Sequence, residues 1–249
     1  MDFADHFSSL ASQYAEFRPG YPDALFAWLA DIVPARKLAW DCACGSGQAS
    51  RGLANYFERV IATDASKGQI AEAPPHAKIE YRVASAENSH LDNHAADLIT
   101  VAQAAHWLKL DAFYEEARRV AAPQGILALW TYEFYSTDDR HILACLTNFY
   151  ENTVSPYWPP ERNYVRTGYR TVPFPFANII EPPIFRMDVS WKFAQILGYL
   201  RTWSATKRFR DEKGIDPVEG LETELLPLWG DPDNARIFTF PIYMRVARL

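Results

Sequence analysis

Cysteine is scarce in this chain of 249 residues, which contains only three. An odd and small number of cysteines argues against a disulfide-stabilised secreted fold and favours reduced thiols. Basic residues are also too few to outnumber acidic ones, 25 against 31, and the formal net charge is -6. Because binding phosphates requires a basic surface, this balance argues against a nucleic acid partner.

Long apolar runs are missing as well. No stretch of about 18 apolar residues occurs, so we expect no membrane-spanning helix and no membrane partner. Residues 1–17 have neither a basic start nor an apolar core, which argues against a secretion signal. We therefore expect a cytoplasmic protein that acts as a monomer or a homodimer on a small molecule.

The first half of the chain alternates short apolar segments with amphipathic ones. Strands are predicted at residues 37–43, 59–64, 79–85, 96–103 and 126–132, with helices at 48–57, after Ser66, and at 110–121. Strands that alternate with crossover helices predict an α/β fold with a parallel sheet covered on both faces. Such sheets bind ligands beyond the carboxyl ends of their strands.

The second half is rich in prolines and aromatic rings, especially between residues 133 and 183. Linkers rarely carry so many large rings, so we expect a cap or insertion there. Residues 185–191 alternate as a strand, and residues 193–203 are typical of a helix. The final segment, 236–249, predicts a long edge-type strand in which Pro241 sits at a bulge.

These patterns predict one domain over residues 1–249 with four parts. An N-terminal helical segment precedes a ligand-binding core, and a cap separates this core from the strands and helices that complete the sheet. The corresponding ranges are 1–36, 37–132, 133–183 and 184–249.

The first predicted strand ends in a turn that contains Asp41, Gly45 and Gly47. Glycines permit a tight turn, and the free N–H groups at a helix start favour an anionic group. Asp64 ends the second strand, where a carboxylate can accept both hydroxyls of a ribose. The ATP-binding pattern G-x-x-x-x-G-K-[ST] is absent, and the G-x-G-x-x-G spacing typical of NAD sites is not met. S-adenosylmethionine has no pyrophosphate and tolerates this looser turn.

Seven segments, taken in order, carry a family resemblance: FRPGYP (17–22), WDCACGSGQAS (40–50), ATDAS (62–66), ASAEN (84–88), ADLITVAQAAHW (96–107), RVAAPQGILALW (119–130) and YLRTWSA (199–205). The chain resembles class I S-adenosylmethionine-dependent methyltransferases, within a group similar to trans-aconitate methyltransferase. The resemblance implies a Rossmann-like, doubly wound fold with helices on both faces. Its mostly parallel sheet would have seven strands, the last of them antiparallel.

The same resemblance implies a set of cofactor-binding residues. The methionine part of the cofactor would contact Asp41, Ala43 and Gly45, and the ribose would contact Asp64. The adenine would lie beside Ala65 and Ser66, with Ala86 and Glu87 at its edge. Gln103 would lie near the sulfonium. Ala43 stands where the family usually has glycine. We expect a slightly shifted turn or weaker cofactor binding, and no loss of binding.

The resemblance also places His106 and Trp107 toward the substrate, with His106 as the candidate catalytic residue. A core histidine is the alternative. Tyr14 and Arg18 would either form a lid over the cofactor or pack the N-terminal segment on the sheet. Arg162, with Arg166 and Arg170, would lie on a solvated helical face or reach a substrate carboxylate.

Cys42 and Cys44 form a C-x-C pair, but no further Cys or His ligands follow at the spacing of a metal site. We therefore expect buried packing thiols and no metal.

The expected reaction is methyl transfer to a small acceptor. No clear acid–base pair is found near the site, and a carboxylic acid oxygen needs none. Together with the resemblance to trans-aconitate methyltransferase, this favours a small acid held by Arg18 or Arg162. An aromatic or natural-product hydroxyl or amine is the alternative acceptor, and a non-catalytic cofactor-binding protein is the alternative class. Nucleic acid N-methylation is disfavoured because AQAAHW replaces its usual [DNS]-P-P-[YFW] turn.

Overall fold

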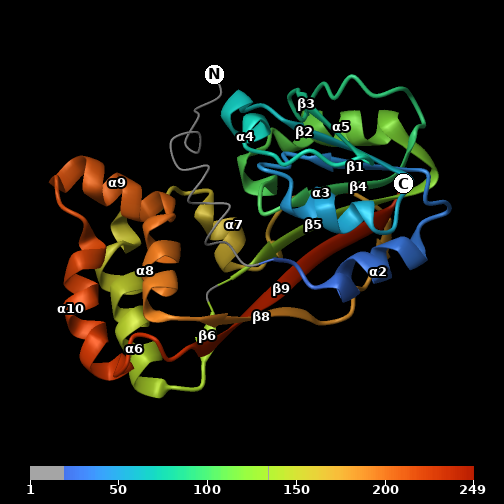
Figure 1. Ribbon diagram of the computed structural model, residues 1–249. Helices are drawn as coiled ribbons and strands as arrows, with labels where there is room; N and C mark the ends of the chain where they lie inside the picture. The colour runs from blue at the N-terminus through green and yellow to red at the C-terminus, as the bar shows by residue number, and fades with distance from the viewer. Residues whose placement is uncertain (1–19, 134) are drawn as a thin grey trace.

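The computed structural model describes residues 20–133 and 135–249, so Tyr14 and Arg18 lie outside the described residues. An open, mostly parallel sheet forms the centre, with the order β3-β2-β1-β4-β5-β9-β6, and β7 and β8 also pair with β9 (Figure 1). The strands are β1 (Leu38–Cys42), β2 (Arg59–Asp64), β3 (Ile79–Val83), β4 (Ala96–Ala102), β5 (Ala121–Tyr132), β6 (Ser136–Thr137), β7 (Asn178–Ile180), β8 (Phe185–Trp191) and β9 (Arg236–Arg248).

Nine strand segments occupy seven positions in this sheet. β5 pairs with β9 from Arg248 to Ile242, and β6 resumes on the same edge at Thr239. β7 and β8 follow one another along the opposite edge of β9. Because β9 runs antiparallel to β5, the predicted α/β sheet with an antiparallel last strand is confirmed, with two of its positions interrupted.

The expectation of an edge position for the last strand is wrong. β9 lies inside the sheet, paired with β5 and β6 on one side and with β7 and β8 on the other. Pro241 pairs in register with Arg186 of β8, without a bulge. On the other edge, pairing lapses between Ile242 and Thr239, so the missing proline N–H removes no bond to β5 or β6 there.

Some helices cover both faces of the sheet, and others form a group beside it. The helices are α2 (Asp23–Ile32), α3 (Gln48–Ala54), α4 (Lys67–Ala71), α5 (Leu110–Val120), α6 (Arg140–Asn148), α7 (Arg162–Arg166), α8 (Phe193–Arg201), α9 (Ser204–Lys213) and α10 (Pro217–Trp229). Alternate strand residues face opposite cores, because side chains alternate along a strand. Ala39 and Val60 join the core that includes Leu25 and Leu53, whereas Trp40 packs with Phe113 of α5.

Helices α6, α8, α9 and α10 form a separate mass beside the sheet, here called the helical lobe (Figure 1). Its core is rich in aromatic rings. The predicted ranges 133–183 and 184–249 both contribute helices to it, and that division of the chain stays a prediction. Val165 and Tyr169, which follow α6, pack on the α5 side of the sheet instead.

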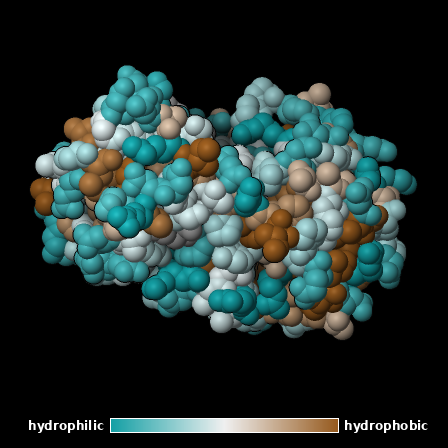
Figure 2. Space-filling model, turned by 90° about the horizontal axis from the view of Figure 1, so that it is seen from below, coloured by the Kyte–Doolittle hydropathy of each residue, from teal (hydrophilic) through white to brown (hydrophobic). Residues whose placement is uncertain are grey.

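Among the described residues, no helix is long and apolar enough to cross a membrane. On the face shown in Figure 2, hydrophilic residues predominate and hydrophobic residues form separate patches.

Candidate functional site

The turn between β1 and α3 depends on left-handed backbone conformations. Ala43, Gly45 and Gly47 have φ angles of 55°, 56° and 82°. A side chain at Gly47 would also place its Cβ 2.3 Å from the hydroxyl of Tyr81, so the tyrosine ring would have to move in addition to the backbone strain. Ala43 occupies a region that alanine rarely adopts, which is the local cost of its departure from glycine.

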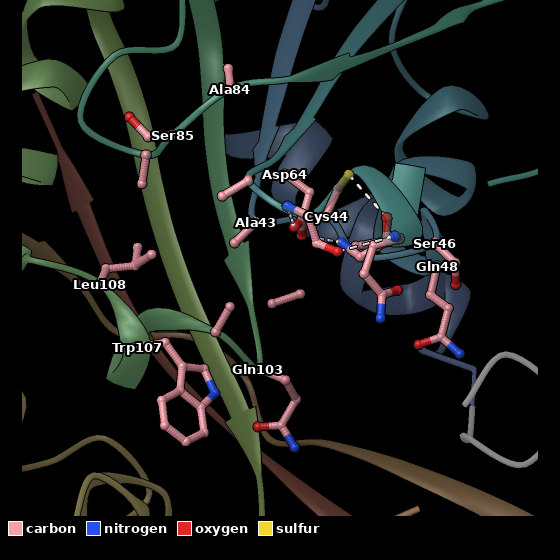
Figure 3. Close-up of a pocket in the computed structure, with 18 of the residues that line it drawn as sticks. Ala43, Cys44, Ser46, Gln48, Asp64, Ala84, Ser85, Gln103, Trp107 and Leu108 are labelled. Carbon is pink, nitrogen blue, oxygen red and sulfur yellow. Dashed lines mark hydrogen bonds between the residues drawn. The ribbon is translucent and has the colours of Figure 1, made fainter. Parts of the chain in front are cut away.

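Asp64 closes this turn from the end of β2. Its Oδ2 accepts a hydrogen bond from the Gly45 N–H at 2.9 Å, and its Oδ1 accepts one from the Ser66 N–H at 2.8 Å (Figure 3). A carboxylate oxygen can accept more than one hydrogen bond, so fixing the turn and accepting the hydroxyls of a ribose are compatible roles for a carboxylate at this position. Ser66 accepts from the Gln69 N–H and caps α4, as predicted.

Asp41 lies beneath the turn and is fully buried. Its carboxylate accepts hydrogen bonds from the Ser50 hydroxyl at 2.5 Å and the Thr100 hydroxyl at 2.9 Å. Burial raises the pKa of Asp41 to about 6, although both hydrogen bonds act in the opposite direction. Asp41 ties β1 to α3 and β4, and it does not line the cavity described next. Its predicted contact with a methionine group stays a prediction.

A cavity of about 580 Å³ opens at the carboxyl ends of β1 to β4. Nine residues predicted from the sequence lie on its wall: Ala43, Gly45, Asp64, Ala65, Ser66, Ala86, Glu87, Gln103 and Trp107. Gln103 and Trp107 lie across the cavity from the β1–α3 turn (Figure 3). The wall also includes residues that the sequence did not single out, among them Gln69, Leu108, Lys109, Glu161 and Arg208.

Gln103 is held firmly at the end of β4. Its backbone has a φ of 57°, and its N–H donates to the Trp130 carbonyl at 2.9 Å. The side-chain amide donates to the Tyr132 carbonyl at 3.3 Å and accepts from the Thr131 hydroxyl. These contacts fix the amide against β5, so it presents a rigid surface to the cavity.

His106 lies behind the cavity wall, next to Trp107. Its Nδ1 is hydrogen-bonded to the Tyr169 hydroxyl at 2.9 Å. Burial, with a smaller contribution from the charge of Arg162, lowers the pKa of His106 to about 3. These contacts agree with the alternative of a core histidine, and they make His106 a weak proton acceptor at neutral pH.

Arg162 does not line the cavity either. Its guanidinium lies 3.8 Å from Glu133 and 4.6 Å from the centre of the Trp158 ring. α7 ends at Arg166, and Gly168 has a φ of 58°, so the three arginines do not share one helical face.

The thiols Cys42 and Cys44 are free and buried. Burial raises the pKa of both well above the usual range. Within residues 20–133 and 135–249, no group of three or more His, Cys, Asp or Glu side chains is placed to hold a metal.

Comparisons with known proteins place this cavity in context. Residues 40–129, which contain the turn, Asp64 and Gln103, match a methyltransferase domain family. A Dictyostelium discoideum protein named as a methyltransferase is 34% identical over 252 residues, covering 99% of this chain and 95% of its own. A solved structure from Anaeromyxobacter dehalogenans, described as a type II methyltransferase, is 44% identical with a TM-score of 0.87. That likeness covers 93% of this chain and 98% of the other, so it includes the helical lobe.

Proposed function

Because the chain belongs to the class I S-adenosylmethionine-dependent methyltransferases, we propose that it methylates an oxygen of a small carboxylic acid. The cofactor is S-adenosylmethionine, which supplies an electrophilic methyl group on a positively charged sulfur that leaves readily. The cavity suits this cofactor, because the turn leaves bare backbone beside Gly45 and the Asp64 carboxylate lies on the wall at the end of β2.

The residues proposed to hold the cofactor all come from loops at the ends of the parallel strands. Ala43 and Gly45 would contact its methionine part, and Asp64 its ribose hydroxyls. The adenine would lie among four further wall residues: Ala65, Ser66, Ala86 and Glu87. Their common position on one cavity supports this assignment.

In methyl transfer, the main tasks of the protein are to align the acceptor with the methyl group and to exclude water. Orientation can contribute on the order of 7–11 kcal/mol to catalysis. Gln103 suits this role because its amide is fixed on both sides. Trp107 and Leu108 add apolar surface beside it. We propose that these three residues form the face against which the acceptor is positioned.

A carboxylic acid acceptor is supported by the position of His106. This residue is the sequence candidate for a general base, yet it lies behind the wall with its pKa lowered to about 3. A carboxylic acid with an ordinary pKa of about 4 is already ionised at neutral pH. Such an acceptor needs no proton removed before it attacks the methyl carbon.

The test is a turnover screen with S-adenosylmethionine over small carboxylic acids, phenols and amines, with the methylated product identified by mass spectrometry. The expected result is methyl ester formation from acids. Methylation of phenols or amines without any reaction of acids would contradict the proposal.

A hydroxyl or amine acceptor is the second candidate, and Glu161 favours it. This carboxylate lies on the cavity wall and could accept the proton that such an acceptor must lose. Under that alternative, Glu161→Gln would lower kcat at least tenfold with an amine or phenol. Under the carboxylic acid proposal, the same variant leaves kcat for an acid nearly unchanged.

A further inference from the structure

Two charged residues reach the cavity from outside the loops that follow β1 to β4. Glu161 directly precedes α7, and Arg208 lies on α9 of the helical lobe (Figure 1). Glu161 is exposed, whereas Arg208 is half-buried. No family motif quoted from the sequence includes either residue. The lobe therefore adds a second cation to a cavity wall that also includes Lys109, which follows β4.

Helix α9 holds Arg208 on its inward face. Ala205, three residues earlier, is fully buried, and Phe209 packs against Tyr157 with ring centres 5.0 Å apart. Residues three and four apart share a helix face, so Ala205, Arg208 and Phe209 lie on the side that faces inward. The packed neighbours fix the base of the arginine side chain.

The Arg208 side chain forms no hydrogen bond or ion pair with any residue in the described part of the chain, in contrast to Lys207 and Arg201. Lys207 on the same helix lies 2.6 Å from Asp211. On α8, Arg201 lies 2.7 Å from Asp216. Glu161 shares the cavity with Arg208 but is not within ion-pair distance of it. A half-buried guanidinium without a partner has lost part of its hydration and gains most from an anionic ligand.

We propose that Arg208 binds a carboxylate in this cavity and that this carboxylate belongs to the methyl acceptor. A guanidinium presents parallel N–H donors that match the two oxygens of a carboxylate. The acceptor assignment rests on the proposed function, while the binding of a carboxylate by Arg208 does not. The methionine part of the cofactor carries the same group, so the experiment must separate the two sources.

The experiment is a calorimetric titration of the protein saturated with S-adenosylhomocysteine. Succinate and citrate are the probes, and succinamide is the uncharged control. We expect both anions to bind, Arg208→Ala to weaken them about tenfold or more, and Arg208→Lys to weaken them less. Arg210→Ala is the matched control, because it removes the same charge from the same helix at a residue that does not line the cavity. It should bind the anions as the unaltered protein does.

A second titration measures S-adenosylhomocysteine itself. Unchanged affinity in Arg208→Ala supports the acceptor as the source of the carboxylate. A tenfold loss there, with succinate and citrate binding intact, assigns the arginine to the cofactor and overturns the proposal. Equal anion binding by Arg208→Ala, or no anion binding by the unaltered protein, overturns it as well. If anion binding depends on Arg208 while only phenols or amines are methylated, the carboxylate site at Arg208 is supported and the carboxylic acid reaction is contradicted.

Discussion

The β1–α3 turn and the helical lobe build the same cavity by different means. The turn relies on backbone, with three left-handed residues and the Gly45 N–H bound by Asp64. The lobe relies on packed rings: Trp203 has Tyr150, Trp158 and Tyr199 within 6 Å between ring centres. The difference implies that substitutions in the turn affect ligand binding, whereas substitutions in the aromatic core of the lobe act through stability.

The largest effect is expected from Trp203→Ala in the lobe. The side chain is buried, and replacing a buried tryptophan by alanine typically costs about 3–5 kcal/mol. Urea unfolding should show this loss, and Trp203→Phe should show a smaller one. In the folded fraction, affinity for S-adenosylhomocysteine should change less than twofold. A parallel loss of cofactor affinity would break the proposed separation between lobe and turn.

The next effect concerns the support of the turn and depends on pH. The pKa of Asp41 is raised from 3.8 to about 6 in the folded protein, so the folded state binds more protons than the unfolded state between these values. Its contribution to stability therefore falls as pH rises through this window, by about 3 kcal/mol in total. Asp41→Asn should remove this slope.

Urea unfolding at pH 4, 5, 6 and 7 checks the difference between Asp41→Asn and the unaltered protein. Subtracting one free energy of unfolding from the other cancels the contributions of the other carboxyl groups, which titrate in both proteins. Identical pH dependence of the two proteins would show that Asp41 does not titrate in this range.

Two glycine-to-alanine substitutions, one in the turn and one in a helix, distinguish the needs of ligand binding from the intrinsic helix propensity of alanine. Gly47→Ala should cost about 1–3 kcal/mol of stability, because its φ is 82° and its Cβ would meet Tyr81. Cofactor affinity should fall at least tenfold with it. Gly220→Ala in α10 meets no atom within 4 Å and should stabilise the protein by up to about 1 kcal/mol. Equal changes in stability and cofactor affinity at both positions would show that the turn has no special requirement for glycine.

The turn was largely predictable from sequence, because its determinants are neighbours in the chain. A strand, a glycine turn and an acid after the next strand indicate Gly45 and Asp64 by their spacing, whereas Ala43 came from the family resemblance. Gln69 was missed, although its place one turn after the Ser66 cap was a usable signal.

The lobe was not predictable in the same way. Its helices come from two separate stretches of chain, and their packing brings Arg208 to the cavity, whereas Arg162 of α7 does not reach it. No local pattern distinguishes these two arginines. The interior position of β9 was missed for a similar reason, because the sequence of a strand does not show whether it pairs on one edge or on both.

The smallest effect sharpens the account of Ala43. Its φ of 55° is unfavourable for alanine, so Ala43→Gly should raise stability by no more than about 1 kcal/mol. Affinity for S-adenosylhomocysteine should rise or stay constant, because the glycine can adopt the same turn without strain. Thermal unfolding and calorimetry measure both quantities, and a weaker cofactor complex would show that the methyl group itself contributes to binding.

The central claim is that S-adenosylmethionine binds at the β1–α3 turn with its ribose on Asp64. The most direct measurement is calorimetric titration of S-adenosylhomocysteine into the protein and into Asp64→Asn, with thermal unfolding to confirm that the variant is folded. Asparagine exchanges one acceptor oxygen for a donor, so affinity should fall about tenfold or more. Equal affinity of the two proteins, or binding of NAD in place of S-adenosylhomocysteine, would contradict the account.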